Sequence, residues 1–249
     1  MSKSKFNILQ PGAVIEFYRD LVESSTYSME TAGCLKGGRT IWALARAVKR
    51  LRVKGQDLID IFLLFATSMD GTMSTVIHPT PVRVVCRNTM QASVGMNGKK
   101  ASIRIPHMTK ITPAILDRCK RQLGLVDGWI DNWESDVNTL ADVAVDRETA
   151  VNYFVELYAK RDDKDVILKE QPKSLEKIVN ALMARYLHGD GANLVSAKDT
   201  AWGLVNAVTG YIDHDVRARS VESRFNSAQY GAGKLVKAKA FEQGLKLAA

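Results

Sequence analysis

The 249-residue sequence has few cysteines and no long apolar segment. Its three cysteines, Cys34, Cys86 and Cys119, are widely separated. An odd number of distant cysteines excludes the disulfide framework of a small secreted protein. The longest apolar run, 59–66, is interrupted by Asp60 and is too short to cross a bilayer. Because the first residues also lack the apolar region of a secretory signal, we expect a cytoplasmic protein with no membrane partner.

Complete catalytic motifs are lacking as well. Residues 231–234, Gly-Ala-Gly-Lys, resemble the end of a phosphate-binding loop, but Ala228 stands where that loop needs glycine, and Leu235 replaces its Ser or Thr. The four histidines are far apart, and no cysteine has metal-ligand spacing. Asp60 and Asp70 are candidates for the paired carboxylates of a metal nuclease, but a hairpin turn explains Asp70 better. We therefore expect neither an enzyme nor a bound metal or cofactor.

Charge is unevenly distributed along the chain. The net charge is +8, but residues 1–125 hold 19 Lys/Arg and 8 Asp/Glu, a net charge of +11. Residues 126–170 carry a net charge of −7, and residues 171–249 carry +4. A high isoelectric point can simply favour solubility. Segregation by region instead favours a polyanionic partner or a self-complementary assembly.

The pattern of elements predicts an α+β fold. Apolar and β-tolerant residues indicate strands, and Gly37-Gly38 and Asp70-Gly71 supply turns between them. From about residue 136 onward, the apolar residues recur at helical spacing. A strand-rich half followed by a helical half is typical of the α+β class. We predict a basic nucleic-acid-binding core over residues 1–125 and a helical region over 126–249 that packs on the core or mediates oligomerisation. The predicted strands are 27–35, 58–67 and 73–78, the last ending before Pro79-Thr80-Pro81.

The segment Thr40–Val53 fits two structures. As a helix, it would gather Ile41, Leu44 and Val48 on one face and its basic residues on the other. As a strand, it would leave the Gly37-Gly38 turn and pair with residues 27–35. Periodicity slightly favours the helix, whereas the preceding turn favours the strand.

The same segment contains an acid-free basic run from Lys36 to Lys54. Several cations along one track suit a nucleic-acid backbone, and an aromatic ring among them suits base stacking. Alternatively, Trp42 belongs to the core and the cations form a solvated face. The candidate nucleic-acid-binding residues in this run are Lys36, Arg39, Trp42, Arg46, Lys49, Arg50 and Arg52.

A second basic region follows. Arg83 is flanked by apolar residues, so it is either a phosphate ligand or a partly buried, ion-paired residue. Asn97-Gly98-Lys99-Lys100 is typical of a basic loop, which is often merely exposed to solvent. The candidate nucleic-acid-binding residues here are Arg83, Arg87, Asn88, Lys99, Lys100 and Arg104.

Several segments resemble a phage- and plasmid-borne family of unknown function. The most specific is Val82-Arg83-Val84-Val85-Cys86-Arg87-Asn88-Thr89; residues 31–44, 104–107 and 202–214 also fit. The order of hairpins and helix is similar, more distantly, to the phage single-strand annealing proteins of the RecT, Erf and Redβ type.

The annealing-protein resemblance implies a twisted sheet and a helix that line a basic groove, and it favours the strand over the helix for Thr40–Val53. It also implies a homo-oligomer, a ring or a filament, that binds single-stranded DNA and anneals complementary strands without ATP during recombination of phage or plasmid DNA in a bacterial cell. The alternative is a phage or plasmid structural or host-interaction protein that oligomerises without nucleic acid.

Overall fold

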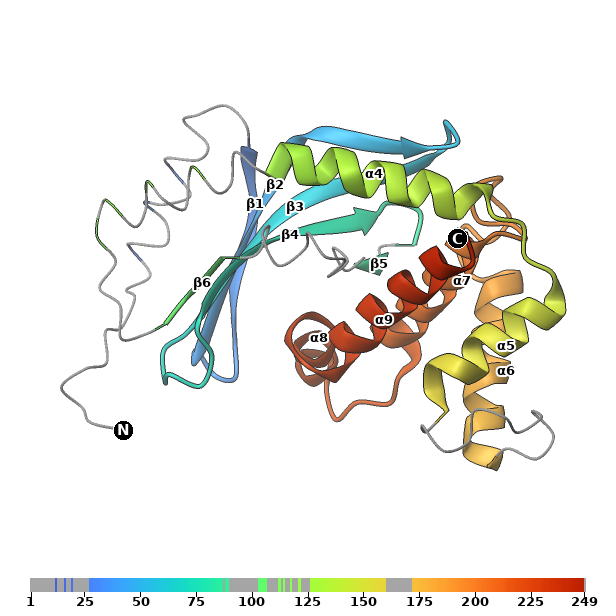
Figure 1. The fold of residues 1–249 in the computed structure, drawn as a ribbon. Coiled ribbons are helices and arrows are strands. Elements are labelled where there is room, and N and C mark those ends of the chain that lie inside the picture. Colours follow the sequence, from blue (N-terminus) through green and yellow to red (C-terminus); the bar gives the residue numbers. More distant parts are fainter. Residues whose placement is uncertain are drawn as a thin grey trace. The chain divides into compact units, whose positions relative to one another are not determined.

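The chain adopts an α+β fold, as the sequence predicts (Figure 1). The computed structural model describes residues 27–86, 88–89, 103–106, 126–159 and 172–248, together with isolated positions before residue 27 and between 106 and 126. The strands are β1 (Tyr27–Leu35), β2 (Thr40–Val53), β3 (Asp57–Ser68), β4 (Thr75–Arg83), β5 (Asn88–Thr89) and β6 (Ile103–Ile105). The helices are α4 (Val126–Asp142), α5 (Arg147–Tyr158), α6 (Lys173–His188), α7 (Ala201–Gly210), the π-helix η4 (Tyr211–Asp215), α8 (Val221–Tyr230) and α9 (Ala232–Lys246).

The described strands form one six-stranded sheet. Its order is β1-β2-β3-β4-β5. Both β5 and β6 pair with β4 on the edge away from β3: β6 pairs near the start of β4, and β5 pairs near its end. β1 and β2 are antiparallel, with Tyr27 opposite Ala47 and Leu35 opposite Thr40. Lys36, Gly37 and Gly38 have φ values of 53°, 63° and 88°, so the turn between these strands uses the left-handed backbone that glycine adopts cheaply. The predicted Gly-Gly turn is thus confirmed.

Thr40–Val53 is a strand over its whole length. Side chains along it alternate, and Ala43, Ala45, Ala47 and Leu51 are buried at a spacing of two residues or a multiple of two. Ile41, Leu44 and Val48 recur at helical spacing, which is why periodicity alone pointed to a helix, and Ala, Leu, Arg and Lys are in addition good helix formers. Pairing with β1 and β3 on both sides supplies the backbone hydrogen bonds and overrides this propensity.

The predicted end of the fourth strand before Pro79 is wrong, because β4 continues through Pro79 and Pro81 to Arg83. Alternate residues of a strand point their N–H groups to the same edge, so the two prolines lack donors on one edge of β4 only. On the edge away from β3, the described strands pair with β4 at Thr75–Ile77 and at Val82–Arg83. The prolines therefore lie between the two paired stretches of that edge.

The chain divides into two compact units, each discontinuous in sequence. The first holds the described residues of Met1–Leu51, Asp60–Pro81 and Gly95–Asn132, and the second holds those of Arg52–Ile59, Val82–Val94 and Trp133–Ala249. The predicted roles of residues 1–125 and 126–249 remain predictions.

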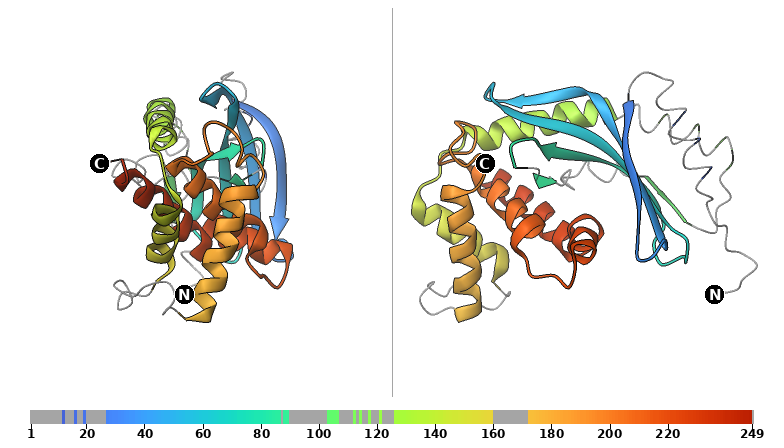
Figure 2. Two further views of the ribbon diagram at one scale, coloured as in Figure 1. Left: turned by 90° about the vertical axis from the view of Figure 1, so that its right-hand side faces the viewer. Right: turned by 180° about the vertical axis from the view of Figure 1, so that it is seen from behind.

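The core of the second unit is aromatic. Trp133 stacks on Phe241 with ring centroids 6.0 Å apart and meets Trp202 edge-on at 6.2 Å. Every residue of α7 is buried, and the side chain of Thr200 caps this helix by accepting a hydrogen bond from the Gly203 N–H. Figure 2 shows the helices of this unit from two further sides. Within the described part of the chain, no helix combines the length and apolar character that spanning a membrane requires.

Candidate nucleic-acid interface

The two faces of β2 differ in what they carry. Odd-numbered residues such as Ala43 and Ala47 are buried, whereas the even-numbered residues from Trp42 to Arg52 project from the opposite face and are partly or fully exposed. This second face is continued by residues of β1 and β3. We call it the arginine face and define it by Trp42, Arg46, Arg50, Arg52 and Phe62.

Trp42 lies against the backbone of β1. It is directly opposite Gly33, and a Cβ atom placed on Gly33 would come within 2.8 Å of the indole Cζ2 atom. The missing side chain of Gly33 therefore makes the space in which the ring rests. Trp42 remains partly exposed, although its indole Nε1 atom is buried.

Arg46 connects an aromatic ring and an acid on this face. Its guanidinium lies 5.7 Å from the centroid of the Phe62 ring on β3, within the range of a cation–π contact. It also pairs with Glu30 at 2.8 Å, at the irregularity where β1 shifts register. The Arg46 side chain is 39% exposed, so it remains within reach of a ligand.

Arg50 and Arg52 extend the row of cations. Arg50 donates two hydrogen bonds to Asp60 of β3, from Nε at 2.5 Å and from Nη2 at 3.2 Å. The Asp60 carboxylate is more shielded than Arg50, at 13% against 42% exposure. Arg52 is exposed, and no described residue forms an ion pair or hydrogen bond with its side chain. Because 42% of the Arg50 side chain is exposed, a phosphate can approach its guanidinium while the bonds to Asp60 remain.

Lys49 and Lys54 point toward α4 instead. Lys49 pairs with Asp131 near the start of that helix, and Lys54 pairs with Asp142 at its end. Lys49 has the same parity as the buried alanines, so it projects from the face of β2 opposite Trp42. The acid-free run of the sequence is thus split between two faces.

Lys36 and Arg39 occupy the β1–β2 turn. Both are exposed, and the Arg39 carbonyl accepts a hydrogen bond from the Met69 N–H at 2.6 Å. Asp70 accepts hydrogen bonds from the Thr72 N–H and hydroxyl, and these bonds, with a smaller contribution from Arg39, lower the pKa of the Asp70 carboxyl. Asp70 therefore belongs to its turn, as the sequence indicates.

Arg83 is buried, with 1% of its side chain exposed. Its Nε lies 2.8 and 2.9 Å from the two oxygens of Asp57, and its Nη2 donates to the Gly191 carbonyl at 3.0 Å. Of the two interpretations of this residue, the structure shows the buried, ion-paired one. A side chain with this exposure cannot reach a phosphate.

Asp57 joins three segments that are distant in the sequence. Besides Arg83, its carboxylate accepts hydrogen bonds from the Ser196 hydroxyl at 2.7 Å and from the Trp202 indole N–H at 3.1 Å. We call Asp57, Arg83, Ser196 and Trp202 the Asp57 cluster. All four are buried, so the cluster satisfies one internal charge pair with neutral donors and fixes the segment around Gly191.

The remaining candidate residues are not brought to the arginine face. Arg104 is exposed on β6, which β3 and β4 separate from β2. The backbone of Asn88 lies in β5. Arg87, Lys99 and Lys100 lie outside the described residues.

Sequence reasoning missed three residues that shape this face. Phe62, Asp60 and Gly33 lie on segments that were predicted only as strands, and Asp60 was considered only as a nuclease carboxylate. Cross-strand register places them beside Trp42, Arg46 and Arg50, and register is not visible in a single sequence. Among the described residues, no group of three or more His, Cys, Asp or Glu side chains is arranged to hold a metal ion.

Comparison with known proteins identifies a family without an assigned activity. The model of a family described as a domain of unknown function, DUF932, matches residues 1–230. No curated protein and no solved structure matches the chain.

Proposed function

The chain belongs to the DUF932 family, a domain of unknown function, and we propose, from its own residues, that it binds single-stranded DNA. The binding surface is the arginine face. One observation carries this proposal. The Trp42 ring rests on Gly33 in the same face as three arginines, and it remains partly exposed.

The spacing of these groups suits a flexible polyanion. Arg46, Arg50 and Arg52 follow one strand at intervals of roughly 7 to 13 Å, given a rise of about 3.3 Å per residue. Guanidinium groups bind phosphate oxygens through paired hydrogen bonds, and they bind more strongly than neutral donors. The side chains of Arg46 and Arg50 are 39% and 42% exposed, so a phosphate can approach them beside their present partners, Glu30 and Asp60.

The aromatic rings favour single strands over duplex. Trp42 and Phe62 can stack on bases only when those bases are unpaired and turned toward the sheet. Duplex DNA offers phosphates to the arginines but hides its base faces. The proposed ligand is therefore a single strand whose backbone follows β2 and whose bases stack on the sheet.

The finer part of the proposal is strand annealing without ATP by a homo-oligomer in recombination of phage or plasmid DNA. It is supported by the distant resemblance to annealing proteins and by the position of β1. This strand ends the described sheet, and residues 28–32 are exposed along it. Edge strands present unpaired backbone groups to a neighbouring chain, which suits assembly into rings or filaments.

A titration of labelled oligo-dT with the protein tests this function. Fluorescence anisotropy is expected to rise to saturation at low salt, with weaker binding to a duplex of equal length. The affinity is expected to fall with salt with a log–log slope of roughly 0.7 per neutralised phosphate. Absence of any anisotropy change at low salt, or oligomers that are indifferent to nucleic acid, would instead favour a structural or host-interaction protein.

Replacing Trp42 by leucine is expected to weaken oligo-dT binding by roughly 5- to 150-fold, because stacking on one aromatic residue is worth ~1–3 kcal/mol per base. Leucine retains an apolar side chain over Gly33 but offers no flat ring. Trp42→Phe is expected to recover part of the loss. The same anisotropy titration measures both variants. Equal affinities of Trp42→Leu and the unmodified protein would remove Trp42 from the interface.

Replacing Asp60 by asparagine is expected to tighten oligo-dT binding by up to about fivefold at low salt, because a unit charge about 4 Å away in water contributes ~1 kcal/mol. The change keeps the size of the side chain while releasing Arg50 from its carboxylate. Glu148→Gln on α5 removes the same charge outside the arginine face and serves as the control. If both variants bind equally well, the gain reflects net charge alone, and Arg50 is not a DNA ligand.

A further inference from the structure

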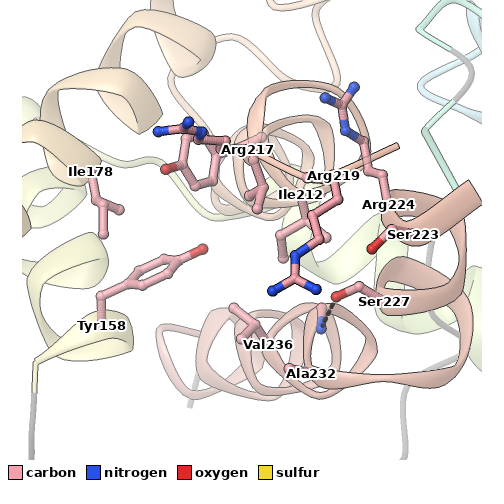
Figure 3. A pocket seen from close by; sticks show the side chains of 14 residues that line it. Tyr158, Ile178, Ile212, Arg217, Arg219, Ser223, Arg224, Ser227, Ala232 and Val236 are labelled. Carbon is pink, nitrogen blue, oxygen red and sulfur yellow. Dashed lines mark hydrogen bonds between the residues drawn. The ribbon is translucent and has the colours of Figure 1, made fainter. Parts of the chain in front are cut away.

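A pocket of about 540 Å³ lies within the helical part of the second unit (Figure 3). Its walls come from the end of α5, from α6 and η4, from the segment 216–219, and from α8 and the start of α9. The size falls in the range of small-molecule sites. We propose that this pocket binds a nucleoside phosphate, independently of DNA binding on the arginine face.

The pocket is rich in positive charge. Arg217, Arg219 and Arg224 line it, and none of the described lining residues is acidic. Figure 3 shows Arg219 extending into the space between Tyr158 and Ser227, with the other two arginines at its border. A ligand with one carboxylate would occupy only one of the three guanidinium groups. A phosphate group has more oxygens and more charge, and it can accept hydrogen bonds from several guanidinium groups at once.

The described residues around these three arginines leave much of their hydrogen-bonding capacity unused. Arg217 and Arg219 are exposed, and within the described part of the chain neither forms an ion pair or hydrogen bond. Arg224 Nε is buried, and no described atom accepts its hydrogen. The nearby carboxylate of Asp215 already accepts two hydrogen bonds from Arg185, one of them from Nη2 at 2.7 Å.

The start of α9 adds backbone donors to the same wall. Ala232 and Gly233 line the pocket, and Gly231 precedes them without a side-chain cap. The Gly233 N–H donates to the Ser227 hydroxyl at 3.4 Å, close to the limit for such a bond. The positive end of this 15-residue helix thus faces the space that the arginines surround.

The opposite wall is apolar and aromatic. Tyr158 and Tyr211 meet edge-on with ring centroids 6.5 Å apart, beside Ile178, Val216 and Val236. Burial raises the pKa of both tyrosine hydroxyls, which keeps them as neutral hydrogen-bond donors. A flat ring fits this wall, and a phosphate fits the other. A ligand that joins the two chemistries is a nucleoside phosphate.

The glycine motif at residues 231–234 has a packing role in this pocket. A Cβ atom on Gly233 would come within 2.8 Å of Ile212 Cγ2 and 3.2 Å of the Ala228 Cα. Gly233 therefore lets α8 and α9 approach closely at the base of the pocket. The motif resembles a phosphate loop only in part, because Ala228 stands where that loop needs glycine and Leu235 replaces its Ser or Thr. The phosphate donors proposed here are the arginines and the start of α9.

Isothermal titration of the full chain with AMP, adenosine and inorganic phosphate tests the proposal. AMP is expected to bind with a dissociation constant below about 1 mM, and the other two are each expected to bind at least about tenfold more weakly. Replacing Arg219 by glutamine is expected to weaken AMP binding by roughly 10- to 100-fold, as for loss of a charge-assisted hydrogen bond. Arg147→Gln, which removes an exposed arginine on α5 outside the pocket, is expected to leave AMP binding unchanged.

Three outcomes would overturn the assignment. They are the absence of saturable AMP binding, adenosine or phosphate binding as tightly as AMP, and equal AMP affinities for Arg219→Gln and Arg147→Gln. Circular dichroism melting of each variant checks that it is folded, and Arg217→Gln provides a second pocket variant if Arg219→Gln is not. None of these readouts uses single-stranded DNA, so failure here leaves the arginine face untouched.

Discussion

Replacing Asp57 by alanine is expected to lower the free energy of unfolding by about 3–5 kcal/mol, because it leaves the Arg83 guanidinium buried without its counter-charge. The side chains of Arg83 and Asp57 are 1% and 0% exposed, so water cannot take the place of the carboxylate. The Ser196 hydroxyl and the Trp202 indole N–H lose their acceptor at the same time. This loss is a large part of the total stability of an ordinary domain.

Thermal unfolding followed by circular dichroism measures this effect, and a fall in melting temperature of roughly 6–20 °C is expected for a chain of this length. The double variant Asp57→Ala, Arg83→Met is expected to recover part of the loss, because it removes both charges together. If the single variant melts within about 2 °C of the unmodified protein, the Asp57 cluster does not hold the second unit together.

The second large effect concerns the arginine face. The triple variant Arg46→Gln, Arg50→Gln, Arg52→Gln is expected to weaken oligo-dT binding by at least about 100-fold at low salt, because charge-assisted hydrogen bonds contribute roughly 1.5–3 kcal/mol each. If each arginine neutralises one phosphate, the log–log salt slope is expected to fall by roughly 2. Anisotropy titrations at several salt concentrations give both numbers.

Lys49 provides a matched control within the same strand. It is adjacent to Arg50 in sequence but projects from the opposite face toward Asp131 of α4. Lys49→Gln is therefore expected to change oligo-dT affinity by less than about twofold, since its exposed ion pair contributes little. An equal loss of affinity in Lys49→Gln and Arg50→Gln would show that net charge, and not the arginine face, governs binding.

The sequence predicted much of the fold through local signals. The Gly-Gly turn, the strand at residues 27–35 and the helical second half all follow from turn chemistry and periodicity. Thr40–Val53 is a segment for which local signals do not decide between helix and strand. Its residues prefer a helix, and it became a strand because partners on both sides complete its backbone hydrogen bonds. The strand assignment came from family resemblance together with the preceding turn.

Which residues lie together on the arginine face was harder to predict from the sequence. The charge run drew attention to Trp42 and its neighbouring arginines, but it could not separate Lys49 from Arg50 without knowing that the segment alternates between faces. Glu30 and Asp60 balance Arg46 and Arg50 from other strands, so an acid-free stretch of sequence is not acid-free in space. The buried pairing of Arg83 depends on Asp57, 26 residues away, and on contacts with Gly191 and its neighbours.

Ultraviolet crosslinking of the protein to an oligo-dT strand, followed by mass spectrometry of the peptides, tests the central claim most directly. The arginine face predicts crosslinks in the tryptic peptide 40–46, which contains Trp42, and in the peptide of β3 that contains Phe62. Both crosslinks are expected to decrease in the triple arginine variant, in which the loss of Arg46 extends the Trp42 peptide to residues 40–49, and to persist in Lys49→Gln. Crosslinks confined to peptides of α5–α9, or none at a concentration that saturates binding, would contradict the assignment of DNA binding to this face.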